Sequence, residues 1–297
     1  MCRNCAVEAP RDGGVEIRGV DEVVAAEHRA RLPPAQPHDH AFGLPSRRMA
    51  SPETIKTVSE LLSASWATLS KFPGQPWWRG HPDATWRLVP SVHRADHGPT
   101  YEPNIAVKFA KRAPTRYPNT PPADDLASWL FLMQHYGLPT RLLDWTESPL
   151  MAAYFAVSEQ AHAAKDGALW VLDPFSMNEV TAGEAGLLQP WHPYVENLVN
   201  LAFTHGTATD PGVAAMTTEE IDLRMLVQQS GFTIHGNSEA LEARSDMAGR
   251  LAKYVIPASA KDRIRRELRS LGVRERTVFP DLEHLARDLA RDEYADC

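Results

Sequence analysis

The sequence predicts an α+β fold, in which one main domain holds a mixed or largely antiparallel sheet flanked by helices. Short runs rich in aromatic and β-branched residues, typical of strands, occur in both halves of the chain. Other segments carry apolar residues at the three-to-four spacing of a helix. The two patterns do not alternate regularly, as they would in a doubly wound parallel sheet, and we find no internal repeat. With 297 residues, 43% of them apolar, the chain can bury a full core.

The chain is predicted to divide near residue 51. Residues 1–50, rich in Arg, Pro, Gly and His, are expected to form a flexible or loosely docked N-terminal arm, and residues 51–297 the main domain. Ser51-Pro52-Glu53 is typical of a helix start, because it offers a capping hydroxyl and a proline in the first turn. The apolar face of that helix would consist of Ile55, Val58, Leu62, Trp66 and Leu69.

The remaining elements follow from local patterns. We expect strands at residues 77–80, 85–90, 167–172, 223–227, 232–235 and 254–256. We expect helices around residues 105–109 and at residues 126–133, 149–157, 194–203, 260–271 and 282–290. Gly137 and Gly272 are placed to end two of these helices, and Ser148-Pro149 to begin a third.

Charge and cysteine usage exclude several function classes. A net charge of −7 argues against a broad phosphate-binding face, so nucleic acid is a less expected partner. No stretch approaches the roughly 20 apolar residues of a membrane span, and the N-terminus lacks the layout of a signal peptide. We therefore expect a soluble, cytoplasmic protein without a membrane partner. Cys2 and Cys5 have half of a zinc-site spacing, but a second pair is missing, so no metal site is expected.

Polar groups gather in the apolar segment at residues 133–150. Asp144 stands between two apolar residues, and burying its carboxylate requires a cation or hydrogen-bond donors. Arg79, Arg141 and His135 are the candidate partners. Two interpretations stay open: a pocket wall, or a buried structural network in which Asp144 pairs with Arg141 or caps the helix at Ser148.

A family resemblance rests on this segment and on an earlier string. Residues 134–146, with Ser148-Pro149 and the later Tyr154-Phe155-Ala156, resemble the central signature of the FRG domain family. That family has a Phe-Arg-Gly motif, and Trp78-Arg79-Gly80 is similar to it with Trp in place of Phe. The resemblance extends over about residues 55–290. It implies a compact domain similar to components of bacterial defence or toxin systems, and it does not specify a reaction.

A second resemblance, in outline, is to ADP-ribosyltransferases of the Arg-Ser-Glu type, and it implies NAD as the cofactor. Their order is an Arg on an early strand, a Ser/Thr-rich strand leading into a helix, and a later carboxylate or glutamine near the ribose. Here Arg79, then Thr146 and Ser148, then Gln228 or Gln229 on an expected late strand follow that order. The residues implied to bind the cofactor are Arg79, Gly80, Arg141, Trp145, Thr146 and Ser148. Aromatic rings expected to stack on NAD belong to Trp77, Trp78, Tyr136 and Trp145.

The chain departs from that pattern at its last element. No Glu-x-Glu or Gln-x-Glu string occupies the region of Gln228, so Asp144 or Glu147 would have to supply the negative charge. The expected catalytic residues are therefore Asp144, Glu147 and Gln228. A competing hypothesis is a binding module without turnover, which recognises a nucleotide-like ligand or a protein segment and docks a partner through residues 1–50. On that hypothesis the pocket of Arg79 and Asp144 holds the ligand. A separate alternative for the single residues is structural: Arg79 forms an ion pair with Asp144, and Gln228 forms a hydrogen bond at a strand edge.

Overall fold

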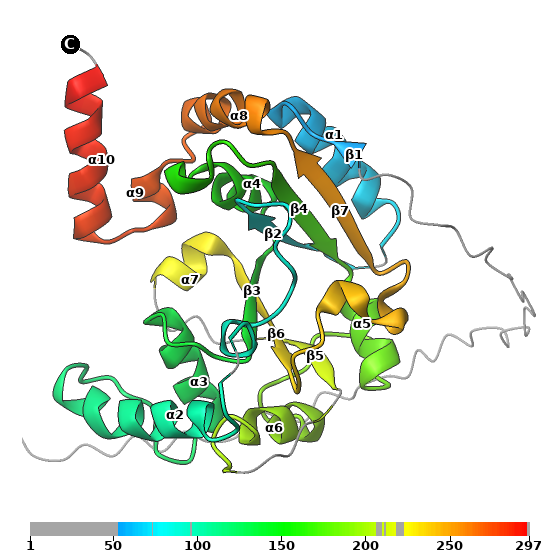
Figure 1. Cartoon of the computed structure of the whole chain (residues 1–297), viewed down its shortest axis with the longest axis vertical. Coiled ribbons are helices and arrows are strands. Elements are labelled where there is room, and N and C mark those ends of the chain that lie inside the picture. Colours follow the sequence, from blue (N-terminus) through cyan, green and yellow to red (C-terminus); the bar gives the residue numbers. More distant parts are fainter. Residues whose placement is uncertain are drawn as a thin grey trace, which may run out of the picture. The chain divides into compact units, whose positions relative to one another are not determined.

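The computed structural model describes residues 53–72, 74–95, 97–205, 210, 212–217 and 223–295, with side chains as far as residue 290 (Figure 1). The expected N-terminal arm and the three cysteines lie outside these residues. The described part forms one α+β domain, which confirms the predicted fold class.

Within the described residues, seven strands form one mixed sheet in the order β1-β7-β4-β2-β3-β6-β5. The strands are β1 (Glu53–Thr54), β2 (Trp77–His81), β3 (Leu142–Thr146), β4 (Gly167–Leu172), β5 (Val213–Met216), β6 (Ser230–His235) and β7 (Leu251–Ile256). Only the short β1 runs parallel to its neighbour β7, and all other neighbours in this sheet are antiparallel. The sheet is thus largely antiparallel, as expected from the irregular order of elements.

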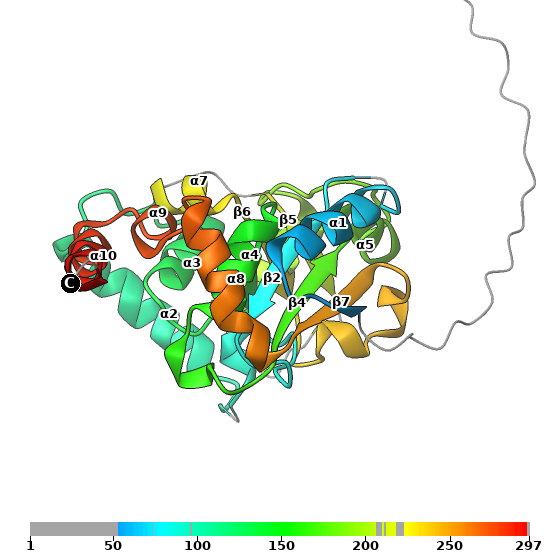
Figure 2. The ribbon, with the colours of Figure 1, turned by 90° about the horizontal axis from the view of Figure 1, so that it is seen from above.

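Helices pack on both faces of this sheet, and on one face they form two groups (Figure 2). The helices are α1 (Val58–Leu69), α2 (Tyr101–Arg112), α3 (Leu126–His135), α4 (Pro149–Val157), α5 (Pro174–Thr181), α6 (Pro193–Asn200), α7 (Leu223–Gln228), α8 (Ala258–Ser270), α9 (Glu275–Val278) and α10 (Leu282–Ala295). One apolar cluster joins α1, α4 and α8 to β2, β4 and β7. A second joins α2, α3 and α6 to β3, β5 and β6.

The opposite face has a third apolar cluster. Its strand residues include Trp77, Leu143, Trp145 and Trp170, all buried. Helix α5 and the short turns at Leu241–Ala243 and Ser245–Met247 cover this side. The large aromatic side chains of β2, β3 and β4 therefore belong mainly to the core.

The sheet is interrupted at its centre. Strands β2 and β3 pair at a single position, where Trp78 lies opposite Thr146. Continued antiparallel pairing would bring Gly80 opposite Asp144, but the ladder stops after the first pair. By contrast, β2 pairs with β4 over five consecutive positions and β3 with β6 over five. The two halves of the sheet thus diverge between β2 and β3.

The first predicted helix begins later than expected. Thr57, and not Ser51, is its N-cap, and its side chain accepts a hydrogen bond from the Glu60 amide. Glu53–Thr54 form β1 instead, because they pair with Tyr254 and Val255 of β7. The buried positions of α1 are Val58, Leu61 and Thr68, whereas the predicted apolar positions Leu62, Trp66 and Leu69 are exposed.

Two predicted strands are wrong. Residues 85–90 form a loop, because the Asp83 carboxylate accepts from the amide and hydroxyl of Thr85 and so closes a turn. Residues 223–227 belong to α7. This short apolar run fits the apolar spacing of a helix as well as that of a strand. Gln229, at φ 48°, then turns the chain directly into β6. The sequence analysis also missed β5, α5 and α9, which are short.

Helix α4 lies directly against β2 at Gly80. A Cβ atom added at this position would stand 1.9 Å from the Ala152 carbonyl oxygen and 2.8 Å from the Ala156 nitrogen. Both are backbone atoms, so neither can rotate away. Ala152, Ala153 and Ala156 make up the small helix face that allows this approach. The glycine of the Trp-Arg-Gly string is thus required by helix packing.

We expect Gly80→Ala to lower the free energy of unfolding by about 1–3 kcal/mol, because the added methyl group must displace α4. Urea denaturation followed by circular dichroism would measure the change. Gly98→Ala is the matched control, because a Cβ there meets no atom within 4 Å. Equal stability of the two variants would contradict the close approach of α4 to β2.

Candidate functional site

A cavity of about 320 Å³ lies where β2 and β3 diverge, and we call it the split cavity. Its walls come from β2, β3, the end of α3, the end of α4, and α7 with the start of β6. The lining residues are Trp78, Arg79, Gly80, Pro82, Gln134, Asp144, Trp145, Thr146, Phe155, Ser158, Glu159, Arg224, Gln228 and Ser230. It therefore gathers six of the nine residues that the sequence assigned to a site.

Arg79 bridges the two strands where their ladder stops. Its Nη1 donates to the Asp144 carbonyl oxygen at 2.5 Å and lies 3.7 Å from the carboxylate Oδ2, while Nε donates to His81 Nε2 at 3.0 Å. Burial lowers the pKa of Arg79, and the charge of Asp144 opposes that shift. Among the described residues, none accepts a hydrogen bond from Nη2. That nitrogen is the donor available to a ligand.

Asp144 is held at the cavity without being buried. Its side chain is 54% exposed, and Oδ2 accepts from Gln134 Nε2 at 2.7 Å. Arg79, one of the candidate partners, pairs with it, and the alternative in which Asp144 pairs with Arg141 is wrong. Asp144 also does not cap α4, because Ser148 itself accepts from the Met151 amide. Of the two earlier interpretations, the pocket wall describes Asp144.

Arg141 lies outside the split cavity. It is buried and forms a bidentate ion pair with Glu102 of α2, with Nη2 2.6 Å from Oε2 and Nε 3.3 Å from Oε1. Its Nη1 also donates to the His235 carbonyl oxygen. These contacts tie α2 to β3 and β6, which gives Arg141 a structural task and leaves the predicted role in cofactor binding without geometric support.

Thr146 and Gln228 both line the cavity, but their side chains are already engaged. The Thr146 hydroxyl donates to the Gln228 carbonyl oxygen at 2.6 Å and accepts from the Ser148 amide. Gln228 is the last residue of α7, not part of the expected strand, and its amide nitrogen donates to Val278 of α9 at 3.1 Å. Thr146 thereby fixes the ends of β3, α4 and α7 against one another.

Three other predicted residues make no ligand-facing contribution with their side chains. The Trp145 indole is buried on the opposite face of the sheet, where it donates to the Thr233 hydroxyl. The indole ring therefore does not face the cavity. Ser148 caps α4 and does not line the cavity. Glu147 is exposed and lies outside the lining set.

The sequence analysis gave no site role to several lining residues. Phe155 and Glu159 come from the end of α4 and from the turn after it, and Arg224 comes from α7. The Arg224 guanidinium lies 4.8 Å from the centre of the Phe279 ring. A signal existed for Arg224 and Gln228, which are four residues apart and share one helix face, but only if the segment is assigned as a helix.

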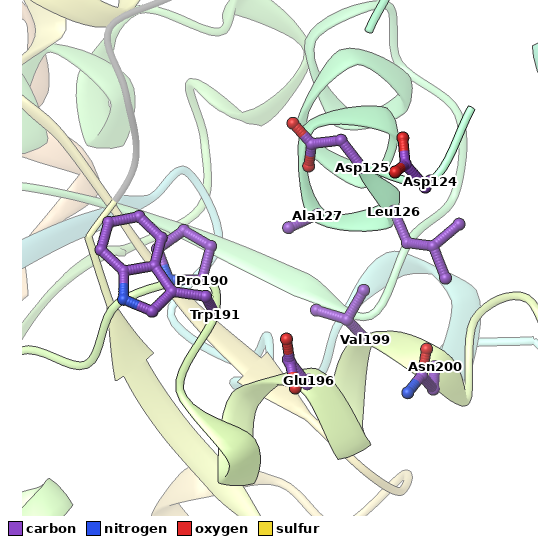
Figure 3. Close-up of a pocket in the computed structure, with 9 residues that line it drawn as sticks. All are labelled: Asp124, Asp125, Leu126, Ala127, Pro190, Trp191, Glu196, Val199 and Asn200. Atoms are coloured by element: carbon purple, nitrogen blue, oxygen red, sulfur yellow. The ribbon is translucent and has the colours of Figure 1, made fainter. Parts of the chain in front are cut away.

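A different cavity, of about 440 Å³, lies between the start of α3 and α6 (Figure 3). Its charged residues are Asp124, Asp125 and Glu196, beside the exposed Trp191. Asp125 is the N-cap of α3, where its carboxylate accepts from the Ser128 amide. None of the predicted site residues lines this cavity, so the split cavity is the candidate site.

We expect Glu102→Ala to destabilise the fold by about 3–5 kcal/mol, because it leaves the Arg141 cation buried without its partner. Asp262→Ala is the matched control, since Asp262 is exposed and pairs with Arg265 at 2.6 Å on the surface of α8. That change should cost less than about 1 kcal/mol. Urea denaturation of both variants tests the contrast. A small effect at Glu102 would leave Arg141 available for a ligand and restore the sequence prediction.

Comparison with known proteins finds one family match, over part of the chain. Residues 74–165 match the family model of the FRG domain, a span that contains β2, α3, β3 and α4. The match ends before α7 and β6, which complete the cavity wall. No curated protein and no solved structure matches the chain. Among the described residues, no helix combines the length and apolar character needed to cross a membrane. The chain therefore carries an FRG domain, whose strands β2 and β3 form the two sides of the split cavity.

Proposed function

We propose that the split cavity binds NAD, or a nucleotide closely similar to it, and that the chain transfers ADP-ribose to an acceptor. The observation that carries this proposal is the Arg79 guanidinium, which lines the cavity with an uncommitted Nη2 beside the half-exposed Asp144 carboxylate. A donor for phosphate oxygens and a negative charge for the ribose thus stand in one cavity.

Nucleotide binding is supported by two arginines and one ring. Arg79 of β2 and Arg224 of α7 both line the cavity, and guanidinium groups bind phosphate oxygens in a fork. Phe155 adds a half-buried ring to the lining, which can contact a planar base. Phe155 replaces the tryptophan rings in the expected stacking role, because those rings are buried in the core.

The carboxylates can support the chemistry. In ADP-ribosyl transfer the bond between ribose C1′ and the nicotinamide nitrogen breaks, and its electron pair leaves with nicotinamide. The acceptor forms a bond to C1′ and gives its proton to a base. Asp144 is the carboxylate proposed to stabilise the positive ribose, and Glu159 in the same lining is proposed as the base. Gln228 lines the cavity but takes no chemical step in this proposal, because its side-chain nitrogen donates to the Val278 carbonyl oxygen.

A second candidate function is a module that binds a nucleotide-like ligand without turnover. The observation that favours it is the engagement of Gln228 and Thr146 in contacts within the domain, together with the position of Glu147 outside the lining. Either function suits a bacterial defence or toxin protein, the role implied by the sequence resemblance to the FRG domain family. Docking of a protein partner through residues 1–50 and a cytoplasmic location stay predictions.

We expect Asp144→Asn to reduce NAD turnover at least about 100-fold, because the variant loses the charge that stabilises the ribose. The assay incubates the protein with NAD and cell lysate and follows nicotinamide release and attachment of ADP-ribose to protein. Glu147→Gln, the same loss of charge outside the cavity, should keep full activity. NAD binding without turnover by the unmodified protein under all conditions would support the binding module and reject the transferase.

We expect Arg79→Gln to weaken NAD binding about 10- to 100-fold, the loss of one charged hydrogen bond to phosphate. Isothermal titration calorimetry measures this, with Arg266→Gln on the exposed face of α8 as the control for loss of positive charge. The melting temperature should fall by only a few degrees, because Asp144 stays solvated when its partner is removed. The opposite outcome is a variant that largely unfolds while its folded fraction binds NAD as tightly as before. Arg79 would then be a structural bridge and not a ligand contact.

A further inference from the structure

A separate cavity of about 560 Å³ lies beside the loop that follows β2, and we call it the histidine cavity. Its lining residues are His81, Trp86, Arg87, Val89, His93, Arg94 and Ser238. It shares no lining residue with the split cavity. Arg79 and His81 stand at the boundary, because Arg79 lines the split cavity and donates to His81, which lines the histidine cavity.

His81 presents a buried donor without a well-aligned acceptor. The residue is 2% exposed, and its Nε2 accepts from Arg79 Nε at 3.0 Å. Arginine can only donate, so Nε2 carries the lone pair and the ring proton sits on Nδ1. Nδ1 is buried and makes no hydrogen bond of ordinary geometry within the described part of the chain, although the Trp86 carbonyl group lies close enough to raise the pKa of the ring. A buried N–H without a well-aligned acceptor is costly, and a ligand in the cavity would supply one.

Cations surround this donor. Burial first, and then the positive charges of Arg79 and Arg94, lower the pKa of His81 to about 3, so the ring stays neutral. Arg94 lines the cavity, and its Nε donates to the Val89 carbonyl oxygen at 2.9 Å, while no residue that the structure describes accepts from its Nη atoms. Arg87 is also in the lining and pairs with Glu242 at 3.3 Å. The guanidinium of Arg94 thus keeps donors for a ligand.

The chemistry of these groups selects an anion. A metal ion is unsuited, because Nδ1 of His81 carries a proton and neighbouring arginines repel a cation. Among the described residues, no cluster of three metal-ligating side chains occurs. A phosphate group matches better, because its oxygens can accept from several donors at once. The cavity is also larger than an isolated ion needs, and Trp86, 39% exposed, gives it an aromatic wall.

We propose that the histidine cavity binds a small organic phosphate, whose phosphate group accepts hydrogen bonds from His81 Nδ1 and from Arg94, and whose organic part contacts Trp86. This assignment goes beyond the proposed function, because it concerns a different cavity and holds whether or not the split cavity binds NAD. The nearby carboxylate of Glu242 is taken by Arg87 and the Leu88 amide.

The test titrates the full chain by isothermal titration calorimetry with phenyl phosphate, inorganic phosphate, phenol and benzoate. Phenyl phosphate should bind with a Kd below about 1 mM, inorganic phosphate more weakly, and phenol not at all. Benzoate should bind more weakly than phenyl phosphate, since a carboxylate accepts from fewer donors. Equal affinity for benzoate and phenyl phosphate, or no binding of either phosphate, would overturn the proposal.

Two variants locate the binding. Arg94→Gln should weaken phenyl phosphate at least tenfold, whereas Arg266→Gln, which removes an exposed charge from α8, should leave it within twofold. Trp86→Leu should reduce the affinity for phenyl phosphate toward that for inorganic phosphate. NAD binding measured on Trp86→Leu separates the two cavities and should stay unchanged, because Trp86 carries no charge and does not line the split cavity. Unchanged phenyl phosphate affinity in Arg94→Gln, or displacement of phenyl phosphate by NAD, would assign the binding elsewhere and reject the histidine cavity.

Discussion

The Arg79 guanidinium joins β2 to β3 where the ladder between these strands stops, and the candidate site is built around this contact. Where backbone pairing ends at Trp78 and Thr146, the side chain reaches the Asp144 carbonyl oxygen and joins the strands. The side chain also supports His81 on its own strand. An arginine can do this and still offer a donor to a ligand, because it carries five N–H groups. The same residue is thus both a structural bridge and the proposed ligand contact.

Polar groups around the bridge form hydrogen bonds with one another. Gln134 at the end of α3 positions the Asp144 carboxylate, and its own carbonyl oxygen accepts from the Thr140 hydroxyl. Thr146 connects β3 to the end of α7. The two helix clusters on this face of the sheet pack on either side of these groups. The cavity is therefore a consequence of how two cores meet, and its polar lining is satisfied largely from within.

The sequence predicted correctly those elements whose formation depends on neighbouring residues in the chain. Residues 167–172 and 149–157 form β4 and α4 as expected, because a continuous apolar run and a Ser-Pro cap are strong signals. The start of α1 could not be found this way, since pairing with β7 about 200 residues later makes Glu53–Thr54 a strand. In the site, Arg79 was the strongest assignment. Which cation meets Asp144 was not predictable, because Glu102 on a distant helix takes Arg141.

The contact of α4 with Gly80 fixes how closely the helix and the strand pack, whichever side chains line the cavity. The separation of α4 and β2, which both line the split cavity, is set by backbone atoms, since Gly80 lies against the Ala152 carbonyl. Phe155, Ser158 and Glu159 project into the lining from the far end of that same helix segment. Replacements at these three positions would change the side chains that line the cavity and leave the contact between Gly80 and Ala152 in place. The lining from this part of the chain can thus vary without a change in the packing of α4 on β2.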